Sequence, residues 1–335
     1  MINGHGDDRH LFTAEIRHNF SSNVYYRGCP KELLSEISSA VQLIENYPSP
    51  AAEELNEAAA GRFQLNSDQF LFTNGATEAF YLIAQLFTGS SVAIVAPTFS
   101  EYEDSCKIHG LNYHLTDKKS IQPDQYQLVF ICNPNNPDGR IIPTNELTLL
   151  IEKSPNTTFV IDEAYIEFTD KIDSIITLAG QLPNLIVVRS LTKTFTIPGL
   201  RLGYIVSSSE IIQKLKSKKM PWSVNALAIH AGQKLFRRYD DWLFDVRELL
   251  AETNAFQHAL SEIEWLELIP SHTSYILTKL KSGTASALKN YLVENHGILI
   301  RDATNFKHLQ GEYIRLSTQS TDANNMLINA LKDWK

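Results

Sequence analysis

The chain has 335 residues, of which 43% are hydrophobic, and its net charge is −8 because 38 acidic residues outnumber 30 basic ones. A chain of this length is large enough for an extensive core divided between two lobes. The excess of acidic residues does not indicate the positively charged surface that binds nucleic acid, so we expect a small ligand. The first ten residues are polar and no run approaches the length of a membrane span, so we expect neither an export signal nor a membrane helix.

The three cysteines, Cys29, Cys106 and Cys132, are odd in number and lie far apart. None of them forms a C-x-x-C spacing, so the pattern predicts neither a disulfide framework nor a zinc site, and we expect no metal. Free thiols of this kind are typical of the reducing cytoplasm, where we expect the protein to be.

The amino-terminal residues predict a polar arm that leads into a helix. Pro30 is a suitable helix start, and apolar residues follow it at helical spacing up to Ile44. Residues 47–50, with two prolines, end this helix, and residues 55–63 predict a second one. We expect the arm and the first helix (residues 1–45) to belong to the smaller lobe.

From residue 70 to residue 206, short runs rich in β-branched and aromatic residues alternate with longer amphipathic stretches. This alternation predicts βαβ units and an α/β fold with a mostly parallel, seven-stranded sheet. The last strand follows the preceding turn too closely for a helical crossover, so we expect it to be antiparallel. The predicted strands are residues 70–73, 92–95, 113–115, 128–131, 158–161, 185–188 and 203–206.

After Met220 the pattern changes to a long helical stretch, residues 226–254 with a break, and then to a smaller α/β unit that runs to the end of the chain. The predicted large domain therefore covers residues 46–221. The predicted small domain covers residues 1–45 and 222–335 and includes the amino-terminal arm.

Polar clusters follow three of the predicted strands, at the point where each strand ends. They are residues 73–78 (TNGATE), 133–139 (NPNNPDG) and 162–165 (DEAY). In an open α/β sheet the ligand crevice forms outside the carboxyl ends of the strands, so we expect these clusters to meet there.

A fourth cluster, residues 189–204 (RSLTKTFTIPGLRLGY), follows the strand at residues 185–188. Lys193 offers an amine for a Schiff base, while nearby hydroxyls and Arg201 offer charge-assisted hydrogen bonds to a phosphate. This combination suits a phosphorylated aldehyde such as pyridoxal 5'-phosphate. A solvated turn is the alternative for this cluster alone, and the three upstream clusters favour the cofactor site.

The four motifs, in this order, together with Arg315, resemble those of the fold-type-I pyridoxal-phosphate aminotransferases over essentially the whole chain. Within that superfamily the chain is most similar to the threonine-phosphate decarboxylases and the histidinol-phosphate aminotransferases. Residues 197–204, residues 220–228 and the pair His5-Gly6 are similar to the decarboxylases.

The resemblance implies roles for the catalytic residues. Lys193 would hold the cofactor aldehyde and then act as acid or base at the substrate Cα. Asp162 would face the pyridine nitrogen, while Tyr165 and Asn136 would hydrogen-bond the phenolic oxygen. The alternative for these three is a capping or loop carboxylate, a core tyrosine and a turn asparagine.

The resemblance also implies the rest of the cofactor site and a homodimer. An aromatic ring, Phe99 or its neighbour Tyr102, would stack on the cofactor, and Tyr47 would reach the phosphate in the neighbouring subunit. Glu78 is expected only to cap a turn. The expected phosphate site comprises Gly75, Ala76 and Thr77 at a helix start, with Ser190, Thr192 and Arg201 on the other side.

Substrate recognition is expected from Arg301 and Arg315, with Asn136 beside them, because two guanidinium groups suit a substrate with two anionic groups. His5 would add a contact if the arm folds over the site, and a disordered terminus is the alternative. Two departures from the family pattern are Asp138, in place of threonine, and Ser274, in place of asparagine.

The resemblance therefore implies decarboxylation of L-threonine O-3-phosphate to (R)-1-aminopropan-2-yl phosphate, a step of cobalamin biosynthesis. The alternative is a histidinol-phosphate aminotransferase of histidine biosynthesis, with 2-oxoglutarate as amino acceptor. A non-catalytic binding module is a third possibility, which the joint presence of Lys193, Asp162 and Arg315 disfavours. The orientation of the substrate decides between the two reactions, and the sequence does not define that orientation.

Overall fold

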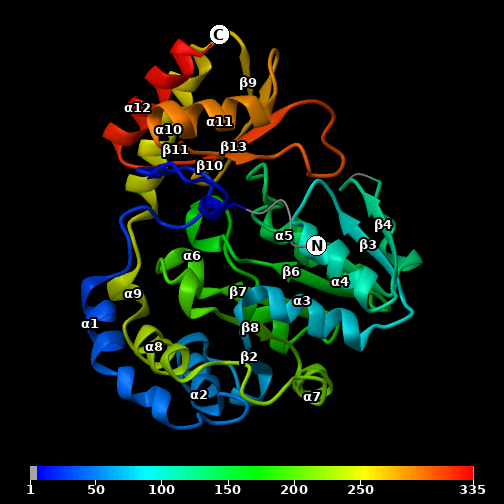
Figure 1. Ribbon diagram of the computed structural model, residues 1–335. Coiled ribbons are helices and arrows are strands. Elements are labelled where there is room, and N and C mark those ends of the chain that lie inside the picture. Colours follow the sequence, from blue (N-terminus) through cyan, green and yellow to red (C-terminus); the bar gives the residue numbers. More distant parts are fainter. Residues whose placement is uncertain (1–5, 119, 335) are drawn as a thin grey trace.

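A seven-stranded sheet forms the centre of the larger lobe in the computed structural model, which describes residues 6–118 and 120–334 (Figure 1). All neighbouring strands run parallel except β8, which is antiparallel to β2 and β7. The predicted α/β fold and mostly parallel sheet are confirmed. In spatial order the strands are β2 (Phe70–Asn74), β8 (Leu202–Val206), β7 (Leu185–Ser190), β6 (Thr158–Asp162), β5 (Leu128–Cys132), β3 (Ser91–Val95) and β4 (Asn112–Thr116).

The antiparallel strand β8 confirms the expectation drawn from its short connection. Only the one-turn helix α6 (Leu191–Thr194) and the 3-10 turn η7 (Pro198–Leu200) separate β7 from β8. A parallel crossover needs a dozen or more residues. The chain therefore returns beside β7 in the opposite direction, which leaves Lys193 and Arg201 at the same edge of the sheet.

Helices cover both faces of this sheet, because alternate strand residues point to opposite sides. One face packs against α2 (Glu53–Phe63), α5 (Thr144–Lys153) and α8 (Ala226–Arg237). The other face packs against α3 (Gly75–Leu86), α4 (Ser100–Ile108) and α7 (Ser209–Lys216). On β6, for example, Phe159 and Ile161 belong to the first core and Val160 to the second.

The packing differs from the predicted domain boundaries at residues 45/46 and 221/222. Helix α8 packs on α2, helix α1 (Lys31–Ser39) packs on α8, and Leu33 and Leu235 lie in the core of the large sheet. Their apolar stripes face the large lobe, whereas a change in sequence pattern after Met220 says nothing about which lobe a helix covers. The break expected within residues 226–254 is present, since this stretch forms α8, α9 (Tyr239–Trp242) and α10 (Val246–Ser261).

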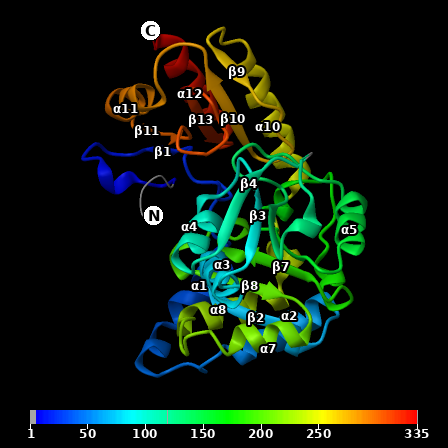
Figure 2. The same ribbon diagram turned by 90° about the vertical axis from the view of Figure 1, so that its right-hand side faces the viewer.

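The smaller lobe contains a four-stranded antiparallel sheet and lies above the large sheet (Figure 2). Its core joins the sheet to α10, α11 (Ala285–His296) and α12 (Thr321–Asp333). The strands in spatial order are β12 (Arg301–Asp302), β13 (Tyr313–Ser317), β10 (Tyr275–Leu280) and β9 (Leu266–Leu268).

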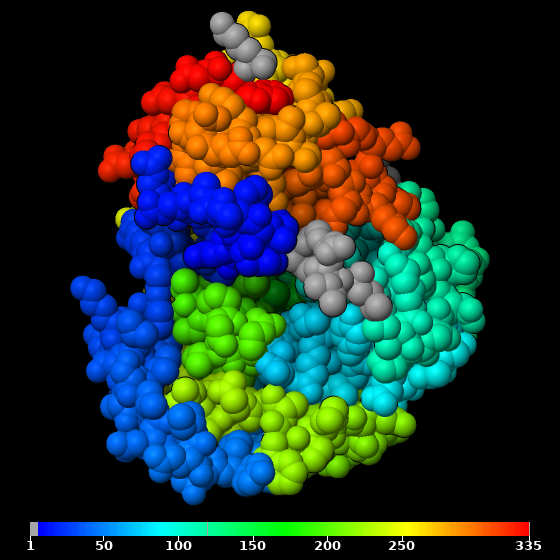
Figure 3. All heavy atoms as spheres, viewed as in Figure 1, coloured from blue at the N-terminus to red at the C-terminus, as the bar shows by residue number. Residues whose placement is uncertain are grey.

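The amino-terminal segment is held on the smaller lobe and lies along the junction of the lobes, in blue in Figure 3. Its strand β1 (His18–Asn19) pairs with β11 (Ile298–Leu299), and Phe20 belongs to the small-lobe core. Asp8 forms an ion pair with Lys289 of α11 at 2.5 Å. Within residues 6–118 and 120–334, no helix is both long and apolar enough to cross a membrane.

Candidate active site

The carboxyl ends of β5, β6 and β7 bring the predicted polar clusters to one edge of the large sheet. Cys132 lies opposite Asp162 in the parallel register of β5 and β6, and Ser190 ends the next strand, β7. Two cavities of about 80 and 260 Å³ open at this edge. Both are lined by Phe99, Asn136, Tyr165 and Lys193.

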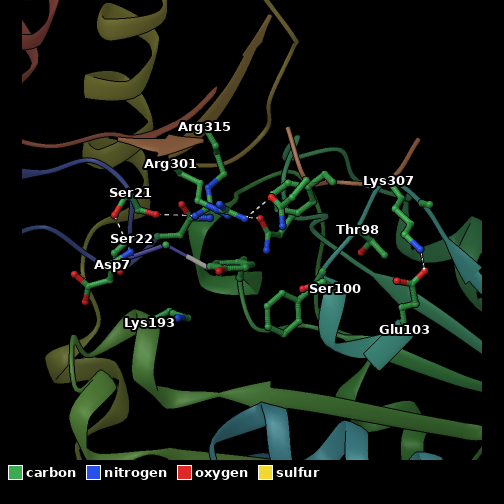
Figure 4. A pocket seen from close by; sticks show the side chains of 18 of the residues that line it. Asp7, Ser21, Ser22, Thr98, Ser100, Glu103, Lys193, Arg301, Lys307 and Arg315 are labelled. Carbon is green, nitrogen blue, oxygen red and sulfur yellow. Dashed lines mark hydrogen bonds and ion pairs between the residues drawn. The ribbon is translucent and has the colours of Figure 1, made fainter. Parts of the chain in front are cut away.

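Lys193 lies in the single turn of α6, directly after β7, and points into the space below Arg301 and Arg315 (Figure 4). Burial lowers the pKa of its amine from 10.5 to about 8, and the positive charges of Arg201 and Arg315 act in the same direction. A neutral amine is the form that attacks a carbonyl carbon. The surroundings of Lys193 therefore prepare it to react with an aldehyde near neutral pH.

Asp162 is buried at the end of β6, where both of its carboxylate oxygens are engaged. Oδ1 accepts a hydrogen bond from the backbone N–H of Ala164 at 2.9 Å, and Oδ2 accepts one from the hydroxyl of Tyr102. Burial raises the pKa of Asp162 to about 6, while the Tyr102 hydroxyl opposes this rise. Such a carboxylate can face a protonated ring nitrogen.

The amino terminus of α3 forms an anion site against Arg201. Gly75 has a φ of +75°, and a Cβ at this position would lie 2.5 Å from Nη2 of Arg201, so only glycine fits. Ala76 and Thr77 follow in the first turn, where free N–H groups and the helix dipole favour anions.

Hydroxyl groups complete the anion site. Ser190 and Thr192 are buried, their oxygens lie 2.7 Å apart, and both line the smaller cavity with Ala76, Thr77 and Arg201. This cavity is thus lined by groups that can bind a phosphate, by the carboxylate of Asp162 and by the amine of Lys193. The residues fit pyridoxal 5'-phosphate, which carries a phosphate, a basic ring nitrogen and an aldehyde.

Two arginines from the smaller lobe face the larger cavity. Arg301 on β12 lies directly opposite Arg315 on β13, and both are buried. Arg315 donates to Oδ1 of Asn136 and, at 2.8 Å, to the carbonyl of Ser21. Burial and then the charge of Arg315 lower the pKa of Arg301 to about 10. Two neighbouring buried cations favour an anionic ligand.

The predicted site residues mostly meet in these two cavities. The smaller cavity is lined by Ala76, Thr77, Phe99, Asn136, Asp162, Tyr165, Ser190, Thr192, Lys193 and Arg201, and Arg301 and Arg315 line the larger one. Gly75 lies beneath Arg201. Tyr47 is 87% exposed on this chain. His5 lies outside the described residues.

Several residues that line the larger cavity were not predicted. Asp7, Ser22 and Asn23 come from the amino-terminal segment, while Thr98 and Ser100 flank Phe99. An ion pair between Glu103 of α4 and Lys307 of the small lobe, at 2.6 Å, also borders this cavity (Figure 4). No motif marks these residues. Only Thr98 and Ser100 could have been inferred from the sequence, because they flank the predicted Phe99.

The two departures from the family pattern lie at buried positions. Asp138 turns inward and forms an ion pair with Nε of Arg140 at 2.5 Å, and it accepts a hydrogen bond from Nδ2 of Asn135 at 2.8 Å. Its charge is therefore compensated locally. Ser274 is buried, and its carbonyl accepts a hydrogen bond from Thr318 N at 2.8 Å.

The chain is similar to known proteins over nearly its whole length. The family described as "Aminotransferase class I and II" matches residues 16–331. A putative threonine-phosphate decarboxylase from Caldanaerobacter subterraneus subsp. tengcongensis is 33% identical, over 90% of this chain and 86% of its own length. A histidinol-phosphate aminotransferase from the same organism is 32% identical, over 91% of this chain and 89% of its own length.

A solved structure is also similar. The crystal structure of L-threonine-O-3-phosphate decarboxylase from Porphyromonas gingivalis has a TM-score of 0.91 and 35% identity, and the match covers 94% of this chain and 98% of that chain. The similarity therefore extends across both lobes.

Proposed function

We propose that this chain, which belongs to the class I and II aminotransferase family and uses pyridoxal 5'-phosphate, decarboxylates L-threonine O-3-phosphate. The product would be (R)-1-aminopropan-2-yl phosphate, as cobalamin biosynthesis requires. The observation that carries this proposal is the pair Arg301 and Arg315, buried side by side across β12 and β13 above Lys193. Two guanidinium groups can together hold the phosphate of this substrate, which would leave its carboxylate free.

The bound cofactor would act as an electron sink for the pair of electrons left when a bond to the substrate Cα breaks. The carboxylate of Asp162 would keep the ring nitrogen protonated, and Tyr165 and Asn136 would lie beside the phenolic oxygen. If Arg301 and Arg315 hold the substrate phosphate, neither guanidinium group would hold the carboxylate, which would be free to leave as carbon dioxide. Lys193, half neutral near pH 8, would then deliver a proton to Cα.

The second candidate is a histidinol-phosphate aminotransferase. The relative with that name is 32% identical to this chain, nearly the same identity as the decarboxylase relative. In this reaction Arg315 would hold the phosphate of histidinol phosphate or, in the other half-reaction, a carboxylate of glutamate, and Lys193 would remove the proton from Cα. The same residues therefore serve both reactions, and substrate orientation distinguishes them.

We also propose that the active form is a homodimer. A run of exposed apolar side chains, which includes Val41, Ile44 and Tyr47, lies beside Met220 and Trp222, with the Tyr47 and Trp222 rings 5.5 Å apart. Apolar surface of this kind is typical of subunit interfaces. In such a dimer Tyr47 would reach the cofactor phosphate of the partner.

We further propose that the protein is cytoplasmic. The three cysteines are free thiols, which supports this proposal.

The two reactions can be separated with one protein preparation. The cofactor-loaded protein is incubated with L-threonine O-3-phosphate, and released carbon dioxide is measured. A parallel incubation contains histidinol phosphate and 2-oxoglutarate, and glutamate is measured. Carbon dioxide without any need for an oxo acid supports the decarboxylase. Glutamate formation without carbon dioxide from the first substrate contradicts it and supports the aminotransferase.

Lys193→Ala serves as the control for both incubations, because it removes the amine on which either reaction depends. Loss of both products, together with loss of the yellow absorbance band of the bound cofactor, is the expected result. Activity that survives in this variant would mean that another amine carries the chemistry.

A further inference from the structure

We propose that Tyr102 is a positioning residue that holds Asp162 ionised and aimed at the ring nitrogen of the cofactor. Its hydroxyl donates a hydrogen bond to Oδ2 of Asp162, while the backbone N–H of Ala164 holds Oδ1. The two donors lie on different elements, α4 and the residues after β6. Together they fix the plane of the carboxylate. Because Asp162 has the same role in both candidate reactions, the inference holds for either of them.

The position of the Tyr102 hydroxyl is determined by the packing of its ring. The ring is completely buried and lies parallel to Phe130, with centroids 5.2 Å apart and an interplanar angle of 7°. Phe80 and Phe99 meet the ring edge to face, at 4.7 and 5.8 Å. Aromatic contacts on several sides leave the ring one orientation. The hydroxyl therefore stays at Asp162 whether or not the cofactor is bound.

The stacking residue and the positioning residue are distinct, which answers the question that the sequence left open between Phe99 and Tyr102. Phe99 lines both cavities, so its ring is available to the cofactor. Tyr102 lies behind Phe99, in the core beneath the site, and contacts the site through its hydroxyl. A tyrosine is needed there for its oxygen, whereas the space itself would accept phenylalanine.

The charged and titratable groups around Asp162 show why this hydrogen bond is needed. Glu163, the next residue, disfavours a second negative charge, although Arg189 forms an ion pair with Glu163 at 3.1 Å. Cys132 of β5 and Lys193 of α6 also face the carboxylate. Burial raises the pKa of Asp162 to about 6, and the Tyr102 hydroxyl is the largest influence that lowers it.

Loss of the Tyr102 hydroxyl would shift Asp162 toward its neutral form. A neutral carboxyl group stabilises a protonated ring nitrogen far less than a carboxylate does, because the opposite charge beside the nitrogen is lost. The proton would then reside on Asp162 for a larger fraction of molecules. We expect turnover to fall roughly ten- to hundred-fold, the range that corresponds to one hydrogen bond to a charged group.

Tyr102→Phe tests this inference directly, because it removes one oxygen and keeps the ring. The loaded enzyme is prepared with pyridoxal 5'-phosphate labelled with 15N in the ring, and the 15N chemical shift is followed from pH 6 to pH 9. The expected result is a shift toward the unprotonated nitrogen throughout this range. This readout reports the proton on the nitrogen and does not depend on activity.

Tyr81→Phe is the matched control. Tyr81 also donates a hydrogen bond to a carboxylate, Oε2 of Glu101 at 2.8 Å, but it does so from α3 and away from Asp162. This variant should leave the 15N shift unchanged. Asp162→Asn supplies the reference shift for a nitrogen without a carboxylate partner. A Tyr102→Phe protein that keeps the wild-type shift would overturn the proposal, even if its melting temperature fell, because Tyr102 would then be only a packing residue.

Discussion

The close approach of β8 to the anion site makes Gly203→Ala a sharp test of how the cofactor phosphate is held. A Cβ on Gly203 would lie 2.5 Å from N of Ala76, 2.7 Å from C of Gly75 and 3.0 Å from O of Arg189. Ordinary contacts of a Cβ begin near 3.4 Å, so the start of α3 would have to move by about 0.9 Å. These atoms are backbone and cannot rotate away.

We expect Gly203→Ala to weaken cofactor binding about 100-fold and to lower the free energy of unfolding by about 1–3 kcal/mol. The first effect follows because a displacement of nearly 1 Å would lengthen the hydrogen bonds from the start of α3 to the phosphate, and a hydrogen bond to a charged group contributes about 1.5–3 kcal/mol. The second is the usual cost of overpacking a close contact. Cofactor affinity is measured by titration of the absorbance band, and stability is measured by urea unfolding of the cofactor-free protein.

Gly61→Ala is the control, since Gly61 lies within α2 and a Cβ there would meet no atom within 4 Å. It should raise the free energy of unfolding by about 1 kcal/mol, because alanine favours a helix more than glycine does, and it should leave cofactor affinity unchanged. If Gly203→Ala binds the cofactor as tightly as the wild type does, the anion site does not depend on this contact and the reasoning is wrong.

Three further results are expected. Without cofactor, Lys193 should react with pyridoxal 5'-phosphate at a rate that rises with pH and levels off above a midpoint near 8, because its pKa is lowered; a midpoint near 10.5 would contradict this. Arg301→Gln should raise KM for a phosphorylated substrate about ten- to hundred-fold with a smaller change in kcat, measured by steady-state kinetics. Glu167→Gln should lower the free energy of unfolding in urea by about 1–3 kcal/mol, since Glu167 accepts hydrogen bonds from buried Arg189 and Tyr239 and glutamine keeps one acceptor oxygen without the charge; unchanged stability would refute this.

The sequence identified the parts of the site that depend on local pattern. The strands of the large sheet and the antiparallel direction of β8 followed from short apolar runs and from the length of the connection. Asp162 and Lys193 were predicted for the same reason, because each directly follows a strand whose end defines the crevice of an open sheet. The family resemblance added Arg315, and Arg301 was expected beside it because it ends a run of three aliphatic residues.

Other features depend on which elements pack together, and the sequence pattern does not encode this. The assignment of α1 and α8 to the large lobe, which differs from the predicted boundaries, comes from the packing of α8 on α2 and of α1 on α8. The Glu103–Lys307 ion pair joins residues about two hundred positions apart, which no local spacing predicts.

The sequence by itself therefore determined the fold class, the cofactor and the residues at the strand ends, because hydrophobic periodicity and short motifs are properties of neighbouring residues. Only the tertiary structure decided that Tyr102 donates to Asp162 while Phe99 lines the cavity, since both are aromatic residues of one segment. Phe99 precedes α4 in extended backbone, whereas Tyr102 lies in the first turn of α4, so their rings point in different directions. The direction of the Tyr102 ring is set by packing against Phe80 and Phe130, which come from other elements of the sheet and its helices.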